Sequence, residues 1–445
     1  MARLLYTLAV IALLPWAALH LLWRARRQPE YLRHWRERFG LYRPTGTSVG
    51  RRSGFSPTCR AEARPTPPTI WIHAVSVGET RAAQPLIAQL AQRYPRHAIL
   101  FTHMTPTGRA TSREIFGDAV RRVYLPYDTP WAMRRFLRRF QPELGLIMET
   151  EIWPNMVHAC RRQGVPLLLV NARLSERSAT RYAAFPKLVQ EALLGLSAIA
   201  AQGEDDAARL AELGASDVIV TGNMKFDIKP PESQLERGRV MRAGFGDRPI
   251  LLAASTREGE EELILDALRL QPIPGLLLLL VPRHPQRFDA VAALAASRGF
   301  ALQRKSANEP LRPDTMVLIG DSMGEMFAYY SACDVAFIGG SLKNYGSQNL
   351  IEACAVGAPL LLGPSTFNFA EAARAALACG AALQVPDAPA LIAAARSLLG
   401  DAERRLAMAR SGRDFAATHR GASERTADLI EHFVPRQPAI TPARR

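Results

Sequence analysis

Short apolar runs alternate with longer amphipathic stretches along most of this chain, and this alternation restricts its fold more than any other feature. The runs of the first series are residues 70–75, 99–102, 123–125, 144–148, 167–170, 199–201 and 218–220. The segments between them are long enough for helices. Strands that alternate with helices are typical of a parallel sheet with helices on both faces. The first half therefore predicts an α/β domain.

The pattern stops after the first series and then begins again. The interruption, residues 229–248, contains Pro230, Pro231, Gly238 and Gly244, which break regular structure. The runs of the second series are residues 250–254, 276–281, 316–319, 335–338 and 360–362. A chain of 445 residues is also too long for one ordinary core. We therefore predict two successive α/β domains with a ligand cleft between them.

The N-terminal segment is apolar enough to enter a membrane. Residues 4–23 contain no Asp, Glu, Lys or Arg, and as a helix they could cross roughly 30 Å of hydrocarbon. Between Arg24 and Arg64 there are eleven Arg and three Glu, and the positive-inside rule places such a cluster in the cytoplasm. We therefore predict a membrane anchor at residues 1–23, with the rest of the chain on the cytoplasmic side.

Two alternatives stay open for this segment. A cleaved signal peptide would need a small-residue cleavage site, and no clear one follows the apolar stretch. Pro15 could kink the helix, which leaves a shallow embedding in the membrane interface. Either form of anchor leaves the body on the cytoplasmic side.

The chain carries a formal charge of +15, which indicates an acidic partner. Nucleic acid, an anionic membrane surface and a phosphorylated substrate would all suit that charge. The sequence lacks zinc-finger and RRM signatures, so we expect no nucleic acid. The five cysteines are scattered without a CxxC pair and indicate neither a disulfide framework nor a zinc site.

The composition also gives predicted domain bounds. Residues 44–68 are rich in Arg, Pro, Ser, Thr and Gly, which is typical of a flexible tether. Residues 402–433 have a helical pattern and could pack back on the first domain. The predicted parts are an anchor at 1–23, a basic juxtamembrane segment and linker at 24–68, a first domain at 69–235, a second at 236–433 and a tail at 434–445.

Residues 339–369, GGSLKNYGSQNLIEACAVGAPLLLGPSTFNF, combine a strand end, a glycine turn, a helix start near Asn349 and another strand. Glycines let a backbone approach a ligand closely, and the first turn of a helix offers unpaired N–H groups to an anion. Glu352, one turn into the helix, could accept both hydroxyls of a ribose. The alternative is an Asn-capped helix with Glu352 at the third position of a capping box. The spacing alone does not separate the two interpretations.

Acidic residues follow two strands of the first domain. Glu79 comes after the strand at 70–75, where a carboxylate could take a proton from an attacking hydroxyl, but Ser76 and Glu79 also fit the S-x-x-E capping box. Capping boxes are more frequent than catalytic bases. Glu149 and Glu151 follow the strand at 144–148 and could orient an acceptor or balance charge.

Basic residues follow strands as well. Lys225, after the strand at 218–220, could neutralise a phosphate or a carboxylate, although a lone lysine is usually solvated. Arg283 follows the strand at 276–281 between two prolines, and arginine is suited to bidentate phosphate contact. The neighbouring His284 could equally be structural, and no second histidine at ligand spacing suggests a metal.

Shared runs in the same order along nearly the whole chain show what it resembles. These runs are residues 5–42, HAVSVGET at 73–80, MTPTGRA at 104–110, YLPYDTP at 124–130, METEIWPN at 148–155, NARLSERS at 171–178, TGNMKFDI at 221–228, STREGEE at 255–261, PRHPQRF at 282–288, GDSMGEM at 320–326 and the glycine run. The chain resembles the 3-deoxy-D-manno-octulosonic acid (Kdo) transferases of lipopolysaccharide synthesis. One departure is Gly346-Ser347-Gln348-Asn349, where the family commonly has Gly-Gly-His-Asn.

The resemblance implies a fold and a set of site residues. The fold is GT-B, two Rossmann-like domains that face a central cleft, here preceded by an N-terminal membrane-anchor helix. Glu79 would be the catalytic base, with Glu149, rather than Glu151, as the first choice for the assisting carboxylate and Lys225 as the catalytic cation. The residues implied to bind the nucleotide are Pro282, Arg283, Met323, Gly324, Glu325, Asn349, Leu350, Ile351 and Glu352.

The resemblance also implies a reaction. An inverting enzyme would move Kdo from CMP-Kdo to the 6'-hydroxyl of the lipid A precursor, lipid IVA, without a metal or other cofactor. The expected partners are CMP-Kdo, lipid IVA and the anionic lipid of a bacterial inner membrane. The alternatives are a GT-B enzyme or an epimerase that uses another nucleotide sugar, and a basic membrane-associated binding protein.

Overall fold

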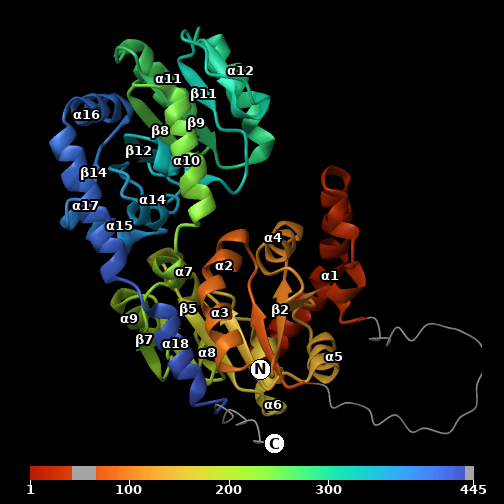
Figure 1. Ribbon diagram of the computed structural model, residues 1–445. Coiled ribbons are helices and arrows are strands. Elements are labelled where there is room, and N and C mark those ends of the chain that lie inside the picture. Colours follow the sequence, from red (N-terminus) through yellow and green to blue (C-terminus); the bar gives the residue numbers. More distant parts are fainter. Residues whose placement is uncertain (43–66, 436–445) are drawn as a thin grey trace, which may run out of the picture. The chain divides into compact units, whose positions relative to one another are not determined.

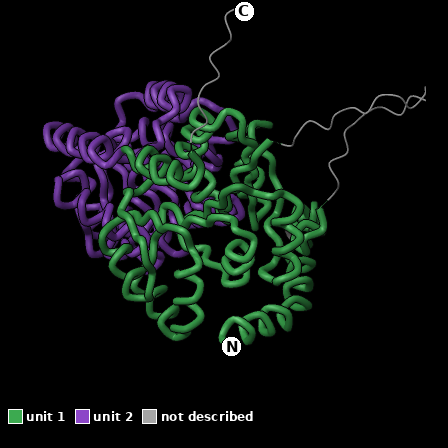
Figure 2. Tube along the Cα trace, turned by 90° about the horizontal axis from the view of Figure 1, so that it is seen from below, with its two compact units in different colours: residues 1–224, 421–445 green, residues 225–420 purple. Residues whose placement is uncertain are grey.

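The computed structural model describes residues 1–42 and 67–435, so most of the predicted linker and tail lies outside the described residues. The described chain divides into two compact units (Figure 2). Unit 1 contains residues Met1–Met224 and Gly421–Arg445, and unit 2 contains residues Lys225–Arg420.

Unit 1 is built on one sheet of seven parallel strands in the order β3-β2-β1-β4-β5-β6-β7. The strands are β1 (Thr69–His73), β2 (Ala98–His103), β3 (Val120–Tyr124), β4 (Leu144–Met148), β5 (Leu167–Ala172), β6 (Ala198–Ala201) and β7 (Val218–Val220). The helices are α1 (Ala2–Arg27), α2 (Val77–Ala82), α3 (Gln84–Arg93), α4 (Pro106–Phe116), α5 (Pro130–Phe140), α6 (Pro154–Arg162), α7 (Glu176–Ala183), α8 (Pro186–Leu193), α9 (Glu204–Glu212) and α18 (Ala422–Glu431). Two 3-10 helices, η1 (Pro29–Leu32) and η2 (Trp35–Phe39), follow α1.

The central strands of unit 1 are apolar on both faces because helices cover both faces. In β1, Ile70 and Ile72 join a core cluster with Leu86 of α3, whereas Trp71 joins the cluster on the opposite face with Phe136 of α5. Side chains alternate across a strand, so one strand supplies both cores. The continuous apolar runs of the sequence therefore correctly predicted buried parallel strands.

Unit 2 repeats this construction with seven parallel strands in the order β10-β11-β9-β8-β12-β13-β14. The strands are β8 (Ile250–Thr256), β9 (Leu277–Pro282), β10 (Leu302–Arg304), β11 (Val317–Ile319), β12 (Val335–Ile338), β13 (Leu360–Leu362) and β14 (Ala382–Gln384). The helices are α10 (Glu232–Phe245), α11 (Glu260–Leu270), α12 (Phe288–Ser297), α13 (Met326–Ala332), α14 (Ile351–Val356), α15 (Ala370–Ala378), α16 (Ala388–Gly400) and α17 (Ala402–Thr418), with 3-10 turns η3 (Met224–Asp227), η4 (Pro285–Arg287) and η5 (Lys305–Ala307).

Every strand that the sequence predicted is present, and the two that it missed, β10 and β14, are the edge strands of unit 2. Both are three residues long and carry polar or charged side chains. An edge strand needs no long apolar run, because one of its sides is not paired within the sheet. The two α/β domains predicted from the alternation are therefore confirmed.

The chain divides at other residues than those predicted. Unit 2 begins at Lys225, not at residue 236, because Phe226 belongs to the core of unit 2 and its ring meets the ring of Phe415 at 5.2 Å. At the other end, the predicted limit of 433 is too late. Only α18 returns to unit 1, whereas α17 packs on α14 in unit 2.

Helix α18 completes unit 1 by packing on α3 (Figure 1). Arg93 of α3 forms ion pairs with Asp428 at 2.6 Å and Glu431 at 2.5 Å, and the Tyr94 hydroxyl donates to the Val434 carbonyl at 2.7 Å. Ile430 of α18 is fully buried in the same core cluster as β1. A segment nearly two hundred residues away in sequence thus closes one face of the first sheet.

Both sheets contain a point at which the chain reverses its direction of strand addition. In unit 1 it lies between the neighbours β1 and β4, and in unit 2 between the neighbours β8 and β12. The loops that leave two such strands diverge, which opens a crevice at their carboxyl ends where α/β proteins bind ligands. The sequences after these strands are therefore where functional groups are expected.

We predict that Ile430→Ala destabilises unit 1. Truncating a fully buried isoleucine should lower the free energy of unfolding by about 2–5 kcal/mol. All six tryptophans lie before residue 154, so tryptophan fluorescence in urea reports on unit 1. Leu406→Ala, at an exposed position of α17, is the matched control. An Ile430→Ala midpoint equal to that of the control would contradict the assignment of α18 to the core of unit 1.

Candidate active site

Three carboxylates gather at the crevice of unit 1. Glu79 follows β1, and Glu149 and Glu151 follow β4, the strand next to it. Burial raises the pKa of Glu79 to about 7, and the nearby negative charges of Glu149 and Glu151 add to that effect. The structure therefore brings together the three acidic residues that the sequence singled out in this domain.

The Glu79 carboxylate is held by hydrogen bonds at both oxygens. Its Oε2 accepts from the Val75 backbone N–H at 2.8 Å, and its Oε1 accepts from the Ser76 hydroxyl at 2.7 Å. Ser76 Oγ in turn accepts from the Glu79 backbone N–H at 3.1 Å and caps α2. The capping arrangement is thus present, and the side chain is 9% exposed.

Capping and proton transfer are compatible at Glu79. The hydrogen bonds fix the carboxylate, which would favour its charged form, while burial and the like charge of Glu149 oppose ionisation. A pKa near the physiological range is what a general base needs.

The backbone at Glu149 adopts an uncommon conformation. Its φ is 58°, in the left-handed region that few residues other than glycine adopt, and its N–H donates to the Val170 carbonyl at 3.0 Å. Glu151 accepts from the Trp153 indole N–H at 3.0 Å, and burial raises its pKa, with the charge of Glu149 adding. Such strain is concentrated at functional sites in proteins.

Two buried histidines lie next to this cluster, and the sequence analysis gave them no role. His73 ends β1 and His103 ends β2; their Nδ1 atoms lie 2.9 Å from Thr102 Oγ1 and 3.2 Å from the Ala74 carbonyl oxygen, respectively. Burial lowers the pKa of each to about 3, so both rings are neutral at pH 7. His73 is the first residue of the shared run HAVSVGET, and its position in that run is the sequence feature that could have pointed to it.

Lys225 is the first residue of unit 2. Its ammonium nitrogen lies 5.2 Å from the centre of the Phe369 ring, a cation–π distance. Phe369 follows β13, and the neighbouring Asn368 donates from Nδ2 to the Tyr345 carbonyl at 2.8 Å in the glycine run. Lys225 therefore lies beside the segment that carries residues 339–352.

Two backbone N–H groups of the glycine run are hydrogen-bonded to a side chain of the protein itself. Glu260 accepts from the N–H groups of Gly340 at 2.6 Å, Leu342 at 3.0 Å and Arg257 at 2.8 Å. A Cβ atom at Gly339 would lie 2.5 Å from the Ser255 carbonyl oxygen. The close approach that requires glycine at 339 is thus to the backbone of Ser255, inside β8.

The helix after the glycine run begins later than predicted. α14 starts at Ile351 and has six residues, and the Asn349 side chain accepts from the Ile351 N–H at 3.1 Å. Leu350, not Asn349, is the N-cap of α14, and it makes no side-chain cap hydrogen bond, so the alternative of an Asn-capped helix with Glu352 at its third position is wrong. Ser347, which stands in place of a family glycine, is 1% exposed and has φ 69°, so a non-glycine residue holds the left-handed turn.

Gln348, in the place of the family histidine, joins two loops. Its Oε1 accepts from Arg283 Nε at 3.1 Å, and its backbone N–H donates to the Gly339 carbonyl at 2.9 Å. Arg283 follows Pro282, the buried end of β9. Gln348 thus orients the arginine that the sequence singled out for phosphate contact.

The third nucleotide-site segment, Met323 to Glu325, follows β11. Met323 is exposed, and the Gly324 carbonyl accepts from Gln234 Nε2 at 2.9 Å. The Glu325 carboxylate pairs with Lys305 at 2.6 Å and Arg237 at 3.2 Å. The predicted nucleotide-site residues follow β9, β11 and β12. Since β11, β9, β8 and β12 are consecutive and parallel, these residues lie along the same carboxyl edge of the sheet of unit 2.

Among the described residues no group of three or more His, Cys, Asp or Glu side chains could hold a metal ion. The four described cysteines, Cys160, Cys333, Cys354 and Cys379, are free.

Two parallel α/β units with candidate groups at the carboxyl edge of each define the GT-B class, and solved structures support this fold. A glycosyltransferase from Rickettsia africae is similar with a TM-score of 0.59 at 14% identity, covering 83% of this chain and 100% of that chain. A UDP-GlcNAc 2-epimerase from Neisseria meningitidis is similar with a TM-score of 0.57 at 16% identity, covering 82% of this chain and 100% of that chain. At these identities the likeness concerns the fold alone.

Sequence comparison gives the family. The family model described as 3-deoxy-D-manno-octulosonic-acid transferase (kdotransferase) matches residues 33–228. A 3-deoxy-D-manno-octulosonic acid transferase from Bordetella pertussis is 45% identical over 98% of this chain and 100% of its own length. A 3-deoxy-D-manno-octulosonic acid transferase from Haemophilus influenzae is 40% identical over 92% of this chain and 93% of its own length. The chain belongs to the Kdo transferase family of glycosyltransferases, as the shared runs indicated.

We predict that Glu79→Gln changes how stability depends on pH. The folded carboxyl keeps its proton up to about pH 7, whereas in the unfolded chain the pKa is near 4.5, so wild-type unit 1 loses stability as the pH rises between these values. The amide does not titrate. The difference in free energy of unfolding, variant minus wild type, should therefore grow across this interval by at most about 3 kcal/mol.

The measurement is urea unfolding followed by tryptophan fluorescence at several pH values. Glu149→Gln should move the interval to lower pH, because a charge that raises the Glu79 pKa is removed. Glu212→Gln, at an exposed position of α9, is the surface control. A difference that is flat between pH 4.5 and 7 would show that the Glu79 pKa is not raised.

Proposed function

We propose that this protein transfers Kdo from CMP-Kdo to the 6'-hydroxyl of lipid IVA with inversion at the anomeric carbon. The observation that carries the proposal is the carboxylate cluster of unit 1, in a chain of the Kdo transferase family. Glu79, with a pKa of about 7, takes the proton of the attacking hydroxyl. The oxygen then attacks the anomeric carbon from the face opposite CMP, which leaves as the bond to phosphate oxygen breaks.

Glu149 is the first choice for the carboxylate that assists this step, because its charge acts on Glu79 more strongly than that of Glu151. A second negative charge would steady the positive character that develops on the sugar as CMP leaves. Glu151 is tied to the Trp153 indole and has a positioning role.

Unit 2 binds the donor in this proposal. Arg283, oriented by Gln348, contacts the phosphate of CMP, and Lys225 supplies a second cation. The other nucleotide-binding residues are Pro282, Met323, Gly324, Glu325, Asn349, Leu350, Ile351 and Glu352. Because the Asn349 side chain accepts from the Ile351 N–H, Asn349 acts by shaping the turn before α14, and Glu352, in the first turn of that helix, meets the ribose.

The proposed reaction uses no metal, because cationic side chains balance the leaving monophosphate. The proposed location is the cytoplasmic face of a bacterial inner membrane, where both CMP-Kdo and the lipid acceptor are available. Helix α1 supports this location, since it is the helix of the described chain that is long and apolar enough to cross a membrane. The anionic leaflet would attract its flanking arginines.

We predict that Glu79→Gln lowers kcat by at least about 100-fold, the contribution typical of a general base. The melting temperature should change by only a few degrees, because the amide oxygen can still accept a hydrogen bond. The assay combines purified protein, CMP-Kdo and lipid IVA, with products resolved by mass spectrometry. Glu212→Gln should keep wild-type turnover. Full turnover by Glu79→Gln would reduce Glu79 to a helix cap and end the proposed mechanism.

We also predict that EDTA leaves the transfer rate unchanged in the same assay. The expected reason is that phosphate charge is met by Arg283 and Lys225 rather than by a divalent ion. Restoring Mg²⁺ after chelation is the control. A rate that falls with EDTA and recovers with Mg²⁺ would replace the metal-free scheme by a metal-assisted one.

A further inference from the structure

We propose that α1 lies in the interface of the membrane on the side of unit 1 and does not cross the bilayer. This inference rests on the proposed attachment to an anionic lipid surface and concerns how the helix attaches. It follows from the contacts that the start of α1 and the later segment η2 both make with residues 124–129 of unit 1, the end of β3 and the loop that joins it to α5.

The first turns of α1 are fixed to unit 1 by buried polar groups. The Tyr6 hydroxyl donates to Asp128 Oδ2 at 3.0 Å, and the Thr7 hydroxyl donates to Asn155 Oδ1 at 2.9 Å. Asn155 also donates from its backbone N–H to Asp128 Oδ2 at 3.0 Å. Thr7 and Asn155 are both buried. Pulling Tyr6 and Thr7 through a bilayer would break this network, taking the Tyr6 hydroxyl from the Asp128 carboxylate and the Thr7 hydroxyl from the Asn155 amide oxygen.

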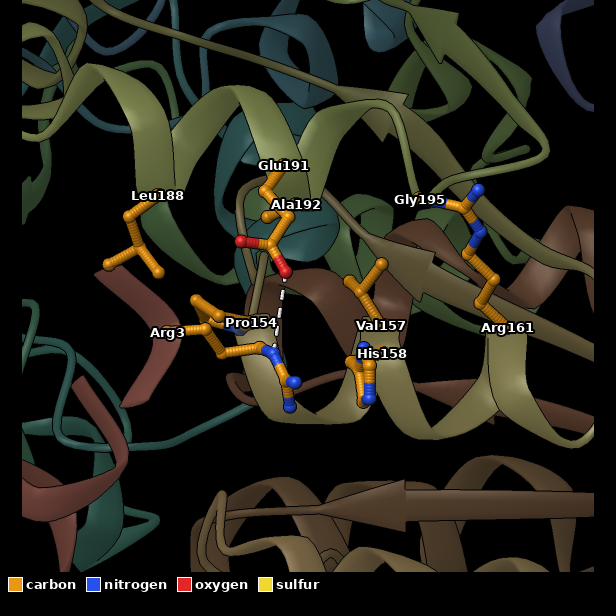
Figure 3. A pocket seen from close by; sticks show the side chains of 9 residues that line it. All are labelled: Arg3, Pro154, Val157, His158, Arg161, Leu188, Glu191, Ala192 and Gly195. Carbon is orange, nitrogen blue, oxygen red and sulfur yellow. Dashed lines mark ion pairs between the residues drawn. The ribbon is translucent and has the colours of Figure 1, made fainter. Parts of the chain in front are cut away.

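The first turn of α1 packs between α6 and α8 (Figure 3). Arg3 points into a small hollow there and pairs with Glu191 of α8 at 3.4 Å. The hollow is lined by Arg3, Pro154, Val157, His158, Arg161, Leu188, Glu191, Ala192 and Gly195. Arg3 thus contacts α6 and α8 of unit 1. A helix that crossed the membrane would carry Arg3 to the other side, away from these helices.

The chain after α1 returns to the same loop. Arg24 donates to the Tyr31 hydroxyl at 3.0 Å, which folds η1 back on the end of α1. In η2, Glu37 accepts from the Tyr124 N–H at 2.8 Å, and the Phe39 ring meets the Tyr127 ring at 5.5 Å. Tyr127 and Asp128 are adjacent, so Tyr6 and Phe39 are tied to neighbouring residues.

Topology then excludes a single crossing. Tyr6 and Phe39 would lie on opposite sides of the membrane if α1 spanned it, but the loop that both contact lies on one side. The return segment, residues 28–36, contains Glu30, Arg33 and Arg36 and cannot form a second crossing. The apolar stretch left after Thr7, residues 8–23, is about 24 Å long as a helix, shorter than the roughly 30 Å hydrocarbon core.

The surface that α1 presents suits an anionic lipid interface. Exposed large apolar side chains in this region are Leu4, Leu5, Leu8, Leu13, Trp16, Leu19, Leu22, Trp23, Leu32 and Trp35. Exposed arginines flank them at 24, 26, 33 and 36. Tryptophan rings are typical of the headgroup level of a membrane, and neighbouring arginines are attracted to negative phospholipids.

This placement brings the lipid surface next to the candidate site. Asn155, which accepts from the Thr7 hydroxyl, is the second residue of α6 and follows the segment that carries Glu149 and Glu151. The docked start of α1 therefore lies at the carboxyl edge of the first sheet. A lipid acceptor could present its headgroup to Glu79 while its acyl chains stay in the membrane.

The test is the side of the membrane on which the N-terminus lies. A cysteine is inserted between Met1 and Ala2 in a chain with Cys59→Ser, so that the insert and Cys379 are the exposed thiols; Cys160 and Cys354 are buried and Cys333 is partly buried. Intact spheroplasts and inverted inner-membrane vesicles are treated with a membrane-impermeant maleimide–polyethylene glycol, and the added mass is read on a gel. The same chain without the insert is the matched control, and vesicles must retain transfer activity.

We expect no labelling of the insert in spheroplasts and labelling of both the insert and Cys379 in inverted vesicles. Labelling of the insert in spheroplasts would show that α1 spans the bilayer, and labelling only after detergent would place the N-terminus within the hydrocarbon; both results overturn the inference. Labelling of Cys379 in spheroplasts would instead place unit 2 outside the cytoplasm. That result contradicts the proposed function and is distinguishable from failure of the α1 inference.

Discussion

Burial of both faces of each parallel sheet is the constraint on which the remaining structure depends. Helices cover Ile70, Trp71 and Ile72 from both sides, so no polar group can be accommodated along the strand without a partner. In the central strands β1 and β2, ionisable side chains are consequently found only at the last residue, His73 and His103, and in the loops that follow. The reversal of strand addition between β1 and β4 then decides which of those loops diverge, and Glu79 and Glu149 stand in that pair.

The carboxylate cluster shows how a structural motif can also prepare a reactive group. Ser76 and the Val75 N–H hold the Glu79 carboxylate in one orientation, as a cap would. Glu149, held with a positive φ, adds a like charge that makes ionisation of Glu79 harder. Glu79 therefore lies in the first turn of a helix, is held as a cap would be and has a pKa near neutrality. The two interpretations of the sequence were not exclusive.

Local patterns allowed much of this structure to be predicted. Apolar runs located the strands. The rule that ligands meet parallel sheets at their carboxyl edge then placed Glu79 and Glu149 at the edge of the sheet of unit 1 and Arg283 at the edge of the sheet of unit 2. Contacts between distant segments could not be predicted in this way: Glu260 binding the Gly340 N–H and Tyr6 binding Asp128. The expected return of the C-terminal segment to the first domain holds for α18, whereas α17 stays with unit 2. The positive φ of Ser347 was equally hidden, because serine rarely marks a left-handed turn.

The return of the C-terminal helix has a consequence for dissecting the molecule. The chain passes from unit 1 to unit 2 after Met224 and comes back at Gly421, so the two units share two covalent connections. A fragment that stops at the first of these would lack α18 and would leave Leu86 and Leu90 of α3 without their cover. Unit 1 can therefore be isolated only if the sequence from 421 onward is supplied as well, either grafted behind residue 224 or added as a separate peptide.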